Sequence, residues 1–268
     1  MTQRAILCPR CRRLVGSEET NCSWCGASRS APWWQFLNWT RGTFDGDWLV
    51  KSLITANVLY FAISLLVDTG SGGFLSPGQT SLMLLGATGT YPINQFGRYW
   101  TLLSAGYLHG GILHLVFNLM ALKQIAPAVV GEYGTSRMFT IYTVSSIIGY
   151  VVSYLAGVPF TIGASAAICG LIGSLLYYGK SRGGAYGSSV YREVSGWVIS
   201  LFIFGIIFPG INNWGHGGGI LGGIAVAALI GYNERRRENY FDYGLALLCG
   251  ISTLGVLVWA VMSASLYR

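Results

Sequence analysis

The sequence predicts an all-α polytopic membrane protein, preceded by a small cysteine-rich domain. Hydrophobic residues make up 52% of the 268 positions and charged residues only 10%, whereas soluble domains carry about 25% charged residues. Seven apolar stretches approach the roughly 20 residues that a membrane-spanning helix needs. These observations exclude a disordered chain and an ordinary soluble domain.

The apolar stretches give the expected order of the membrane-spanning helices. The polar, glycine-rich residues 180–193 and the charged residues 233–240 are expected to form loops between them. Residues 68–109 mix glycine and proline with bulky apolar side chains, so we expect them to fold in the membrane interface. The seven stretches lie at about 48–67, 110–130, 138–157, 163–179, 194–211, 213–232 and 243–265.

The basic residues predict how these helices are oriented. Lysine and arginine collect on the cytoplasmic side of membrane proteins, and a cytoplasmic N-terminus places 13 of them in inner segments and 2 in outer segments. The first 30 residues lack the apolar core of a signal peptide, so the first span is expected to direct insertion. We therefore expect an integral protein of a prokaryotic plasma (inner) membrane, with its N-terminus in the cytoplasm and its C-terminus outside.

The net charge of +7 does not indicate a nucleic-acid partner. The basic residues are dispersed over short loops and are not gathered on one face, so membrane lipids are the expected surroundings. A transporter is also disfavoured, because the chain shows neither internal repeats nor charged residues in the middle of its spans.

Four cysteines within residues 1–29 predict a cytoplasmic zinc ribbon. Cys8 and Cys11 form one C-x2-C pair, Cys22 and Cys25 form a second, and two such pairs can place four thiolates around Zn²⁺. A disulfide pair and unliganded thiols are the alternative interpretations. Four thiolates leave no open coordination position, so the zinc would be structural. The ribbon could then dock a partner that the sequence does not identify, or regulate the core.

Residues 30–47 form an aromatic-rich linker, which we expect to lie on the inner membrane surface. The membrane domain then comprises residues 48–268.

The polar residues inside the spans indicate a functional site. Ionisable groups are costly in hydrocarbon and usually have a function, although each one can also simply bond a neighbouring helix. In the expected orientation, spans two, four and six begin at the outer face, and His114, Ser165 and His216 each lie a few residues beyond those starts. Asn118 shares a helix face with His114. We expect these four side chains to converge on one pocket.

Glycines in two spans predict how that convergence occurs. Small residues at helical spacing allow helix backbones to pack closely in lipid, and both helices carry them beside a polar residue. Close contact would bring Ser165 within reach of His216. The glycines are Gly163, Gly170 and Gly173 in the fourth span, and Gly215, Gly217, Gly218, Gly219, Gly222 and Gly223 in the sixth.

This set of residues indicates a serine nucleophile. Serine needs a base to take its proton, and His216 is the best-placed candidate. All ten acidic residues lie in loops or at span ends, so we expect a dyad without a carboxylate. His114, the Asn118 amide and the backbone N–H groups in the first turn of the fourth span could stabilise an oxyanion.

Three segments resemble the signature segments of the rhomboid family of intramembrane serine proteases. They read LHGGILHLVFNLMAL, GASAAICG and NNWGHGGGILGG, and EYGTSRMFTIY at the third span is also similar. The resemblance covers about residues 48–268. It implies a rhomboid-like six-helix core plus one C-terminal transmembrane helix. It also implies cleavage of transmembrane-helix protein substrates near their outer end, with no metal or cofactor in catalysis.

The resemblance also assigns roles to individual residues. It makes Ser165 the nucleophile and His216 the base, and it places His114 and Asn118 at the oxyanion. His109, the third histidine in this region, and Gly163 take supporting roles.

The chain departs from the family pattern at three positions. Ala166 follows the serine where glycine is usual, Cys169 stands where many members have an aromatic residue, and Thr101 replaces an arginine. None of these changes removes a catalytic group. The alternative reading is a catalytically inactive rhomboid-like protein that binds or escorts transmembrane helices. The aromatic residues of the fifth span are interpreted equally well as a lateral gate or as lipid-facing side chains.

Overall fold

The computed structural model describes residues 5–7, 14–16, 19–23, 46–68, 70, 72–208 and 210–266. The chain divides into two compact units, Met1–Trp48 and Leu49–Arg268. In the first unit, strands β1 (Ala5–Leu7) and β2 (Leu14–Gly16) pair antiparallel, with Ile6 opposite Val15.

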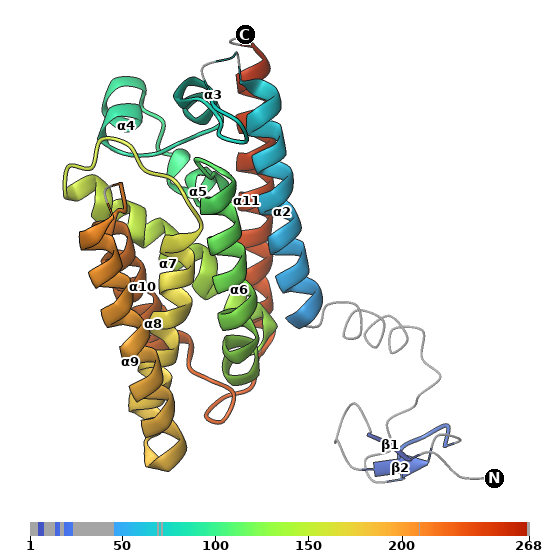
Figure 1. The fold of residues 1–268 in the computed structure, drawn as a ribbon. Coiled ribbons are helices and arrows are strands. Elements are labelled where there is room, and N and C mark those ends of the chain that lie inside the picture. Colours follow the sequence, from blue (N-terminus) through green and yellow to red (C-terminus); the bar gives the residue numbers. More distant parts are fainter. Residues whose placement is uncertain are drawn as a thin grey trace. The chain divides into compact units, whose positions relative to one another are not determined.

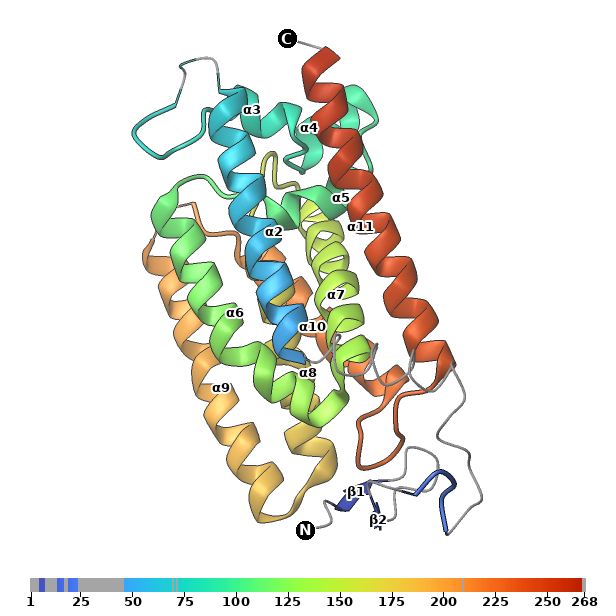
Figure 2. The same cartoon turned by 90° about the vertical axis from the view of Figure 1, so that its right-hand side faces the viewer.

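The second unit is a bundle of long helices that run alternately up and down (Figures 1 and 2). Helix α10 packs most extensively against α8 and α7, while α9 contacts mainly α8. The long helices of the described chain are α2 (Gly46–Val67), α6 (Ile112–Tyr133), α7 (Thr135–Leu155), α8 (Ser165–Arg182), α9 (Gly184–Ile207), α10 (Asn213–Ile230) and α11 (Tyr240–Leu266).

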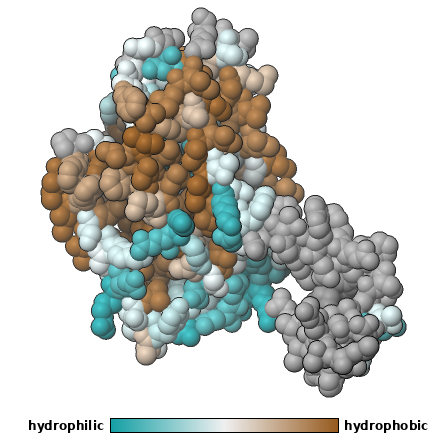
Figure 3. Space-filling view, turned by 45° about the vertical axis from the view of Figure 1, so that its right-hand side comes forward, coloured by the Kyte–Doolittle hydropathy of each residue, from teal (hydrophilic) through white to brown (hydrophobic). Residues whose placement is uncertain are grey.

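Five of these helices, α2, α6, α7, α9 and α11, are long and apolar enough to cross a membrane. Figure 3 shows apolar residues over the middle of the visible face of the bundle, with hydrophilic residues gathered towards one end. Helices α8 and α10 overlap two further predicted spans; each is 18 residues long and contains glycines and polar residues. The protein is thus an all-helical membrane protein in its second unit, and the count of seven crossings stays a prediction.

The expected loop at residues 180–193 is wrong. Helix α8 continues to Arg182, Gly183 turns the chain with φ of +68°, and α9 begins at Gly184. Glycine in this segment serves close packing of the two helices, because a β-carbon on Gly187 would lie 2.7 Å from the carbonyl oxygen of Gly179. Polar composition predicts a loop here, whereas these residues form the polar ends of two long helices.

Residues 72–109 contain a series of short helices at the end of the bundle where α6 begins. The last of them pack into the bundle, since Ala105 and Tyr107 are buried. Thr88 pairs through its backbone with Thr161, in the loop between α7 and α8. The helices are α3 (Gln79–Leu84), α4 (Thr90–Phe96), α5 (Thr101–Ser104) and the 3₁₀ turn η1 (Ala105–Tyr107).

Glycine allows α10 to approach α7 and α8 at backbone contact distance. A β-carbon on Gly223 would collide with the carbonyl oxygen of Gly170, and one on Gly219 would collide with that of Ala166. On the α7 side, a β-carbon on Gly149 would lie 2.7 Å from the backbone of α10. This is the close packing that the glycine pattern predicts.

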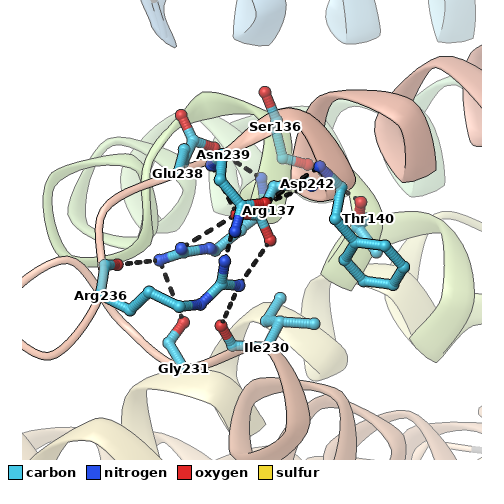
Figure 4. A network of polar contacts seen from close by, with 10 residues as sticks. Ser136, Arg137, Thr140, Ile230, Gly231, Arg236, Glu238, Asn239 and Asp242 are labelled. Atoms are coloured by element: carbon cyan, nitrogen blue, oxygen red, sulfur yellow. Dashed lines mark hydrogen bonds and ion pairs between the residues drawn. The ribbon is translucent and has the colours of Figure 1, made fainter.

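A buried ionic network joins α7, the α10–α11 connection and α11 (Figure 4). It lies at the end of the bundle opposite to the one where α6 begins. Arg137 and Asp242 pair at 3.0 Å with side chains that are 1% exposed, and Arg236 also bonds Asp242 at 2.8 Å. Arg137 donates further to the carbonyl oxygen of Arg236 at 2.7 Å, and Arg236 to that of Ile230 at 2.8 Å. The two buried charges, Arg137 and Asp242, pair with each other, and Arg236 is 39% exposed, so this network attaches α11 to the rest of the bundle without an uncompensated buried charge.

Candidate active site

Ser165 is the first residue of α8, and the chain before it is held from two sides. Gly163 has φ of +124°, a conformation that favours glycine. Its N–H donates to the carbonyl oxygen of Ala105 at 2.9 Å, and its own carbonyl accepts from the Tyr150 hydroxyl at 2.6 Å. This loop therefore fixes the position at which α8 begins and at which Ser165, which is partly exposed, presents its hydroxyl.

His216 lies in the first turn of α10, facing Ser165. Its Nε2 is 2.9 Å from Ser165 Oγ, and the residue is only 7% exposed. The two helix starts meet because α8 and α10 pack through their glycines. The structure thus brings together the serine and the histidine that were paired from the sequence.

The other ring nitrogen of His216 has no hydrogen-bond partner among the described residues. The buried carboxylate of Asp242 belongs to the ionic network at the far end of the bundle, where Arg137 and Arg236 bind it. Within the described part of the chain, the arrangement is therefore a serine–histidine pair without a third carboxylate member.

His114 reaches the same place from α6. A β-carbon on Gly163 would lie 2.8 Å from His114 Nε2 and 3.7 Å from Ser165 Oγ, so the imidazole borders the serine loop. Its Nδ1 faces the Gly110 N–H at 3.4 Å. If Nδ1 accepts this bond, Nε2 carries the proton and is a donor directed at the site.

Asn118 lies one turn further along α6 and is 7% exposed. Its Nδ2 donates to the carbonyl oxygen of His114 at 2.8 Å, which leaves its second amide proton for another acceptor. His109 packs behind this pair: it is fully buried, and its ring centroid is 5.0 Å from that of His114 in an edge-on arrangement. The structure therefore places His109 next to His114 and not at the serine.

Two of the residues that depart from the family pattern, Ala166 and Cys169, lie near Ser165, and both pack between helices. Ala166 is 2% exposed and clusters with Ala105 and Tyr150. Cys169 is 1% exposed and faces Gly219 on α10, one turn beyond His216. Both small side chains lie where α7, α8 and α10 come closest.

Tyr150 and Asn212 contact the site but were not found from the sequence. Asn212 precedes α10, and its Oδ1 accepts from the Gly215 N–H at 3.0 Å, as a helix cap does. An asparagine just before an expected helix is a signal that could have identified it. No comparable local pattern marks Tyr150, whose partner Gly163 lies in a separate segment.

Most of the predicted zinc site falls outside the described residues. Of the four cysteines only Cys22 is described, and it is buried. Among the described residues, no group of three or more histidine, cysteine or acidic side chains is placed to hold a metal. The zinc ribbon therefore stays a prediction.

Residues 97–233, about half of the chain, match the family model described as the Rhomboid domain. The chain belongs to the rhomboid family. This match contains Ser165, His216, His114 and Asn118, which the structure gathers at one end of the bundle.

Curated relatives include named rhomboid proteases. The chain is 35% identical over 180 residues to rhomboid protease GluP of Bacillus subtilis (strain 168). This alignment covers 66% of this chain and 35% of that protein. It is 27% identical to RHOMBOID-like protein 4 of Arabidopsis thaliana, over 72% of this chain and 54% of the relative. The chain thus spans about a third of the length of the first relative and about half of the length of the second.

A further relative is matched along most of its length. Rhomboid-like protease 3 of Toxoplasma gondii is 27% identical over 231 residues, which cover 84% of this chain and 85% of that protein.

Proposed function

We propose that this protein is an intramembrane serine endopeptidase that cleaves transmembrane segments of membrane proteins, with Ser165 as nucleophile and His216 as general base. The observation that carries the proposal is the 2.9 Å approach of His216 Nε2 to Ser165 Oγ at the meeting point of two helix starts. Membership of a family with named proteases supports the reaction class. The orientation predicted from the basic residues would place this end of the bundle, and the cleavage, at the outer face.

The reaction begins with attack of Ser165 Oγ on the carbonyl carbon of a peptide bond in the substrate. His216 Nε2 takes the hydroxyl proton, and the carbonyl oxygen becomes an oxyanion. The Nε2 proton of His114, the remaining Asn118 amide proton and the first-turn N–H groups of α8 are the donors available to it. His216 then protonates the leaving amine, and the C–N bond breaks to leave an ester on Ser165.

Hydrolysis of this ester regenerates the enzyme. His216 removes a proton from a water molecule, which attacks the ester carbonyl, and Ser165 leaves with that proton. Because His216 Nδ1 has no acceptor within the described chain, the imidazolium gains no carboxylate stabilisation. Binding geometry and the oxyanion donors must then supply most of the rate enhancement.

Cleavage of a single-span substrate by the purified full-length protein in detergent tests the proposal. We expect Ser165→Ala and His216→Ala to abolish both cleavage and labelling by a fluorophosphonate, which reacts with activated serines. Ser174→Ala is the matched control, because Ser174 lies on the same helix and its hydroxyl donates within that helix, to the carbonyl oxygen of Leu171 at 2.7 Å. A folded parent protein that neither cleaves nor labels would instead indicate a protein that binds transmembrane helices without cutting them.

A further inference from the structure

The carboxamide of Asn212 joins three segments that meet at the serine–histidine pair. Its Nδ2 donates to Ser153 Oγ on α7 at 2.8 Å and to Thr161 Oγ1 in the loop before α8 at 2.9 Å. Its Oδ1 accepts from the Gly215 N–H at 3.0 Å. The backbone carbonyl of Asn212 also accepts from the His216 N–H at 3.1 Å.

These contacts use every polar atom of the side chain. The amide nitrogen carries two protons and meets two hydroxyl oxygens, while the amide oxygen caps α10. The cap alone would be satisfied by serine, threonine or aspartate. The two donated bonds have no part in capping, and they connect the helix that carries His216 with the loop that leads to Ser165.

Both hydroxyl partners of Asn212 belong to segments that are held independently. Ser153 donates its own proton to the carbonyl oxygen of Gly149 at 2.9 Å, so its oxygen can accept from Asn212. Thr161 exchanges two backbone bonds with Thr88, at 3.1 and 2.7 Å. Asn212 is therefore bonded to anchored groups on two sides, and a change in its length or polarity is transmitted to the helix start on which His216 lies.

We propose that Asn212 is a positioning residue that sets the distance between Ser165 and His216 by bridging the start of α10 to α7 and to the serine loop. This inference rests on the proposed protease function. The residue acts through His216 and the loop, and takes no part in proton transfer itself. A reacting geometry that is loosened by about 1 Å can cost about 100-fold in rate, so the bridge matters for turnover more than for substrate binding.

Three variants of the full-length protein separate the bridge from the cap. Asn212→Ser keeps a capping hydroxyl but is too short to reach both partners. Asn212→Asp keeps the cap, and its second oxygen can accept from the Thr161 hydroxyl. Thr161→Val removes one partner and leaves the backbone pairing with Thr88 in place. Tyr154→Phe is the matched control, because it removes a 2.9 Å bond to Asn94 between α7 and α4 at the same end of the bundle.

The measurements are kcat and KM for a transmembrane substrate, the rate of fluorophosphonate labelling and the temperature of unfolding. We expect Asn212→Ser to lower kcat and labelling about tenfold or more with KM little changed, and Asn212→Asp to recover most of this loss. Thr161→Val should lower kcat in the same direction, and adding it to Asn212→Ser should have little further effect, because both changes remove the same bond. Tyr154→Phe should match the parent.

Parental kcat and labelling in folded Asn212→Ser would overturn the inference, and so would additive effects of Asn212→Ser and Thr161→Val. If Asn212→Ser does not fold, Thr161→Val alone decides, and parental kcat in that variant is the contrary result. A parent protein that is neither active nor labelled would overturn the proposed function, and this inference with it. A labelled parent with an equally labelled Asn212→Ser variant would overturn the inference alone.

Discussion

Gly163 shows how much of the site depends on one residue without a side chain. It combines a left-handed backbone conformation, two backbone hydrogen bonds and direct contact with His114. Any other residue would have to tolerate the conformation and also displace the imidazole.

We predict that Gly163→Ala lowers the reactivity of Ser165 by about 100-fold or more. The new methyl group would lie 2.8 Å from His114 Nε2, so either the histidine or the loop that positions Ser165 must move. A displaced oxyanion donor costs about 100-fold or more in kcat. The measurement is the rate of fluorophosphonate labelling, together with thermal unfolding to confirm the fold.

Gly157→Ala is the control for backbone strain in the same loop. Gly157 also has a positive φ, of +81°, but a β-carbon there meets no atom within 4 Å. We expect a modest loss of stability, about 1 kcal/mol, with labelling preserved. Equal loss of labelling in both variants would show that strain in the loop, and not contact with His114, limits the site.

At the level of elements, the approach of α10 to α8 decides whether the serine and the histidine meet. We predict that Gly223→Ala destabilises the bundle by about 1–3 kcal/mol, because the added methyl group would collide with the carbonyl oxygen of Gly170. Labelling should fall as well, since α10 carries His216. Unfolding in detergent and the labelling rate measure the two effects.

A glycine on α11 provides the opposite case. Gly255 lies within that helix, and a β-carbon there meets no atom within 4 Å. Gly255→Ala should therefore leave labelling unchanged and not lower the unfolding temperature, because alanine favours helix more than glycine does. Destabilisation of similar size in both variants would contradict the packing role assigned to Gly223.

The fifth predicted span, α9, contains two phenylalanines with different surroundings. Phe202 reaches α10 beside His216, where its Cζ would lie 3.6 Å from a β-carbon on Gly217. Phe204 is 51% exposed and packs on Phe208, with ring centroids 4.1 Å apart. Phe202 therefore makes a contact between helices, whereas Phe204 lies at the outer surface of the bundle.

We predict that Phe202→Ala raises the rate of transmembrane-substrate cleavage, because a loosened α9 opens the way to the site more readily. Labelling by a small fluorophosphonate should change less than cleavage does. Phe204→Ala is the matched control and should behave like the parent. Unchanged cleavage in Phe202→Ala would leave α9 as a lipid-facing helix and remove it from the path of the substrate.

For the whole molecule, the cysteine-rich unit and the helical bundle pose separate questions. Catalysis as proposed uses only residues of the bundle, so a metal in the N-terminal unit would be structural. We predict that the purified parent protein contains about one zinc ion per chain, bound by four thiolates, and that the variant Cys8→Ser/Cys11→Ser loses it. Metal analysis by mass spectrometry is the measurement.

Cleavage by the same cysteine variant shows whether the two units are coupled. Cys249→Ser is the matched control, since this cysteine lies in α11 of the bundle. Equal zinc content in the parent and in Cys8→Ser/Cys11→Ser would contradict the zinc ribbon.

Much of the bundle could be predicted because membrane-spanning helices leave strong local signals. The apolar stretches located all the long helices to within a few residues at most ends, apart from the N-terminal part of α9. The polar residues Ser165 and His216 stood out against an apolar background, and glycines at helical spacing indicated the close packing that joins them. The error at residues 180–193 arose because polarity reports contact with water, which loops and the exposed ends of helices share.

The sequence by itself determined the order of the long helices and singled out the polar residues within them that are proposed to act as nucleophile and base, since hydrophobic length and the cost of buried polar groups are local properties. Only the tertiary structure decided which side chains hold the segments of that site in place. Tyr150 bonds Gly163 across 13 residues, Asn212 bonds Thr161 across 51, and the Arg137–Asp242 pair spans 105. No local pattern encodes such pairs. The two partners meet only when packing brings distant segments together, and they must bond each other because packing excludes the water that would otherwise satisfy their polar groups.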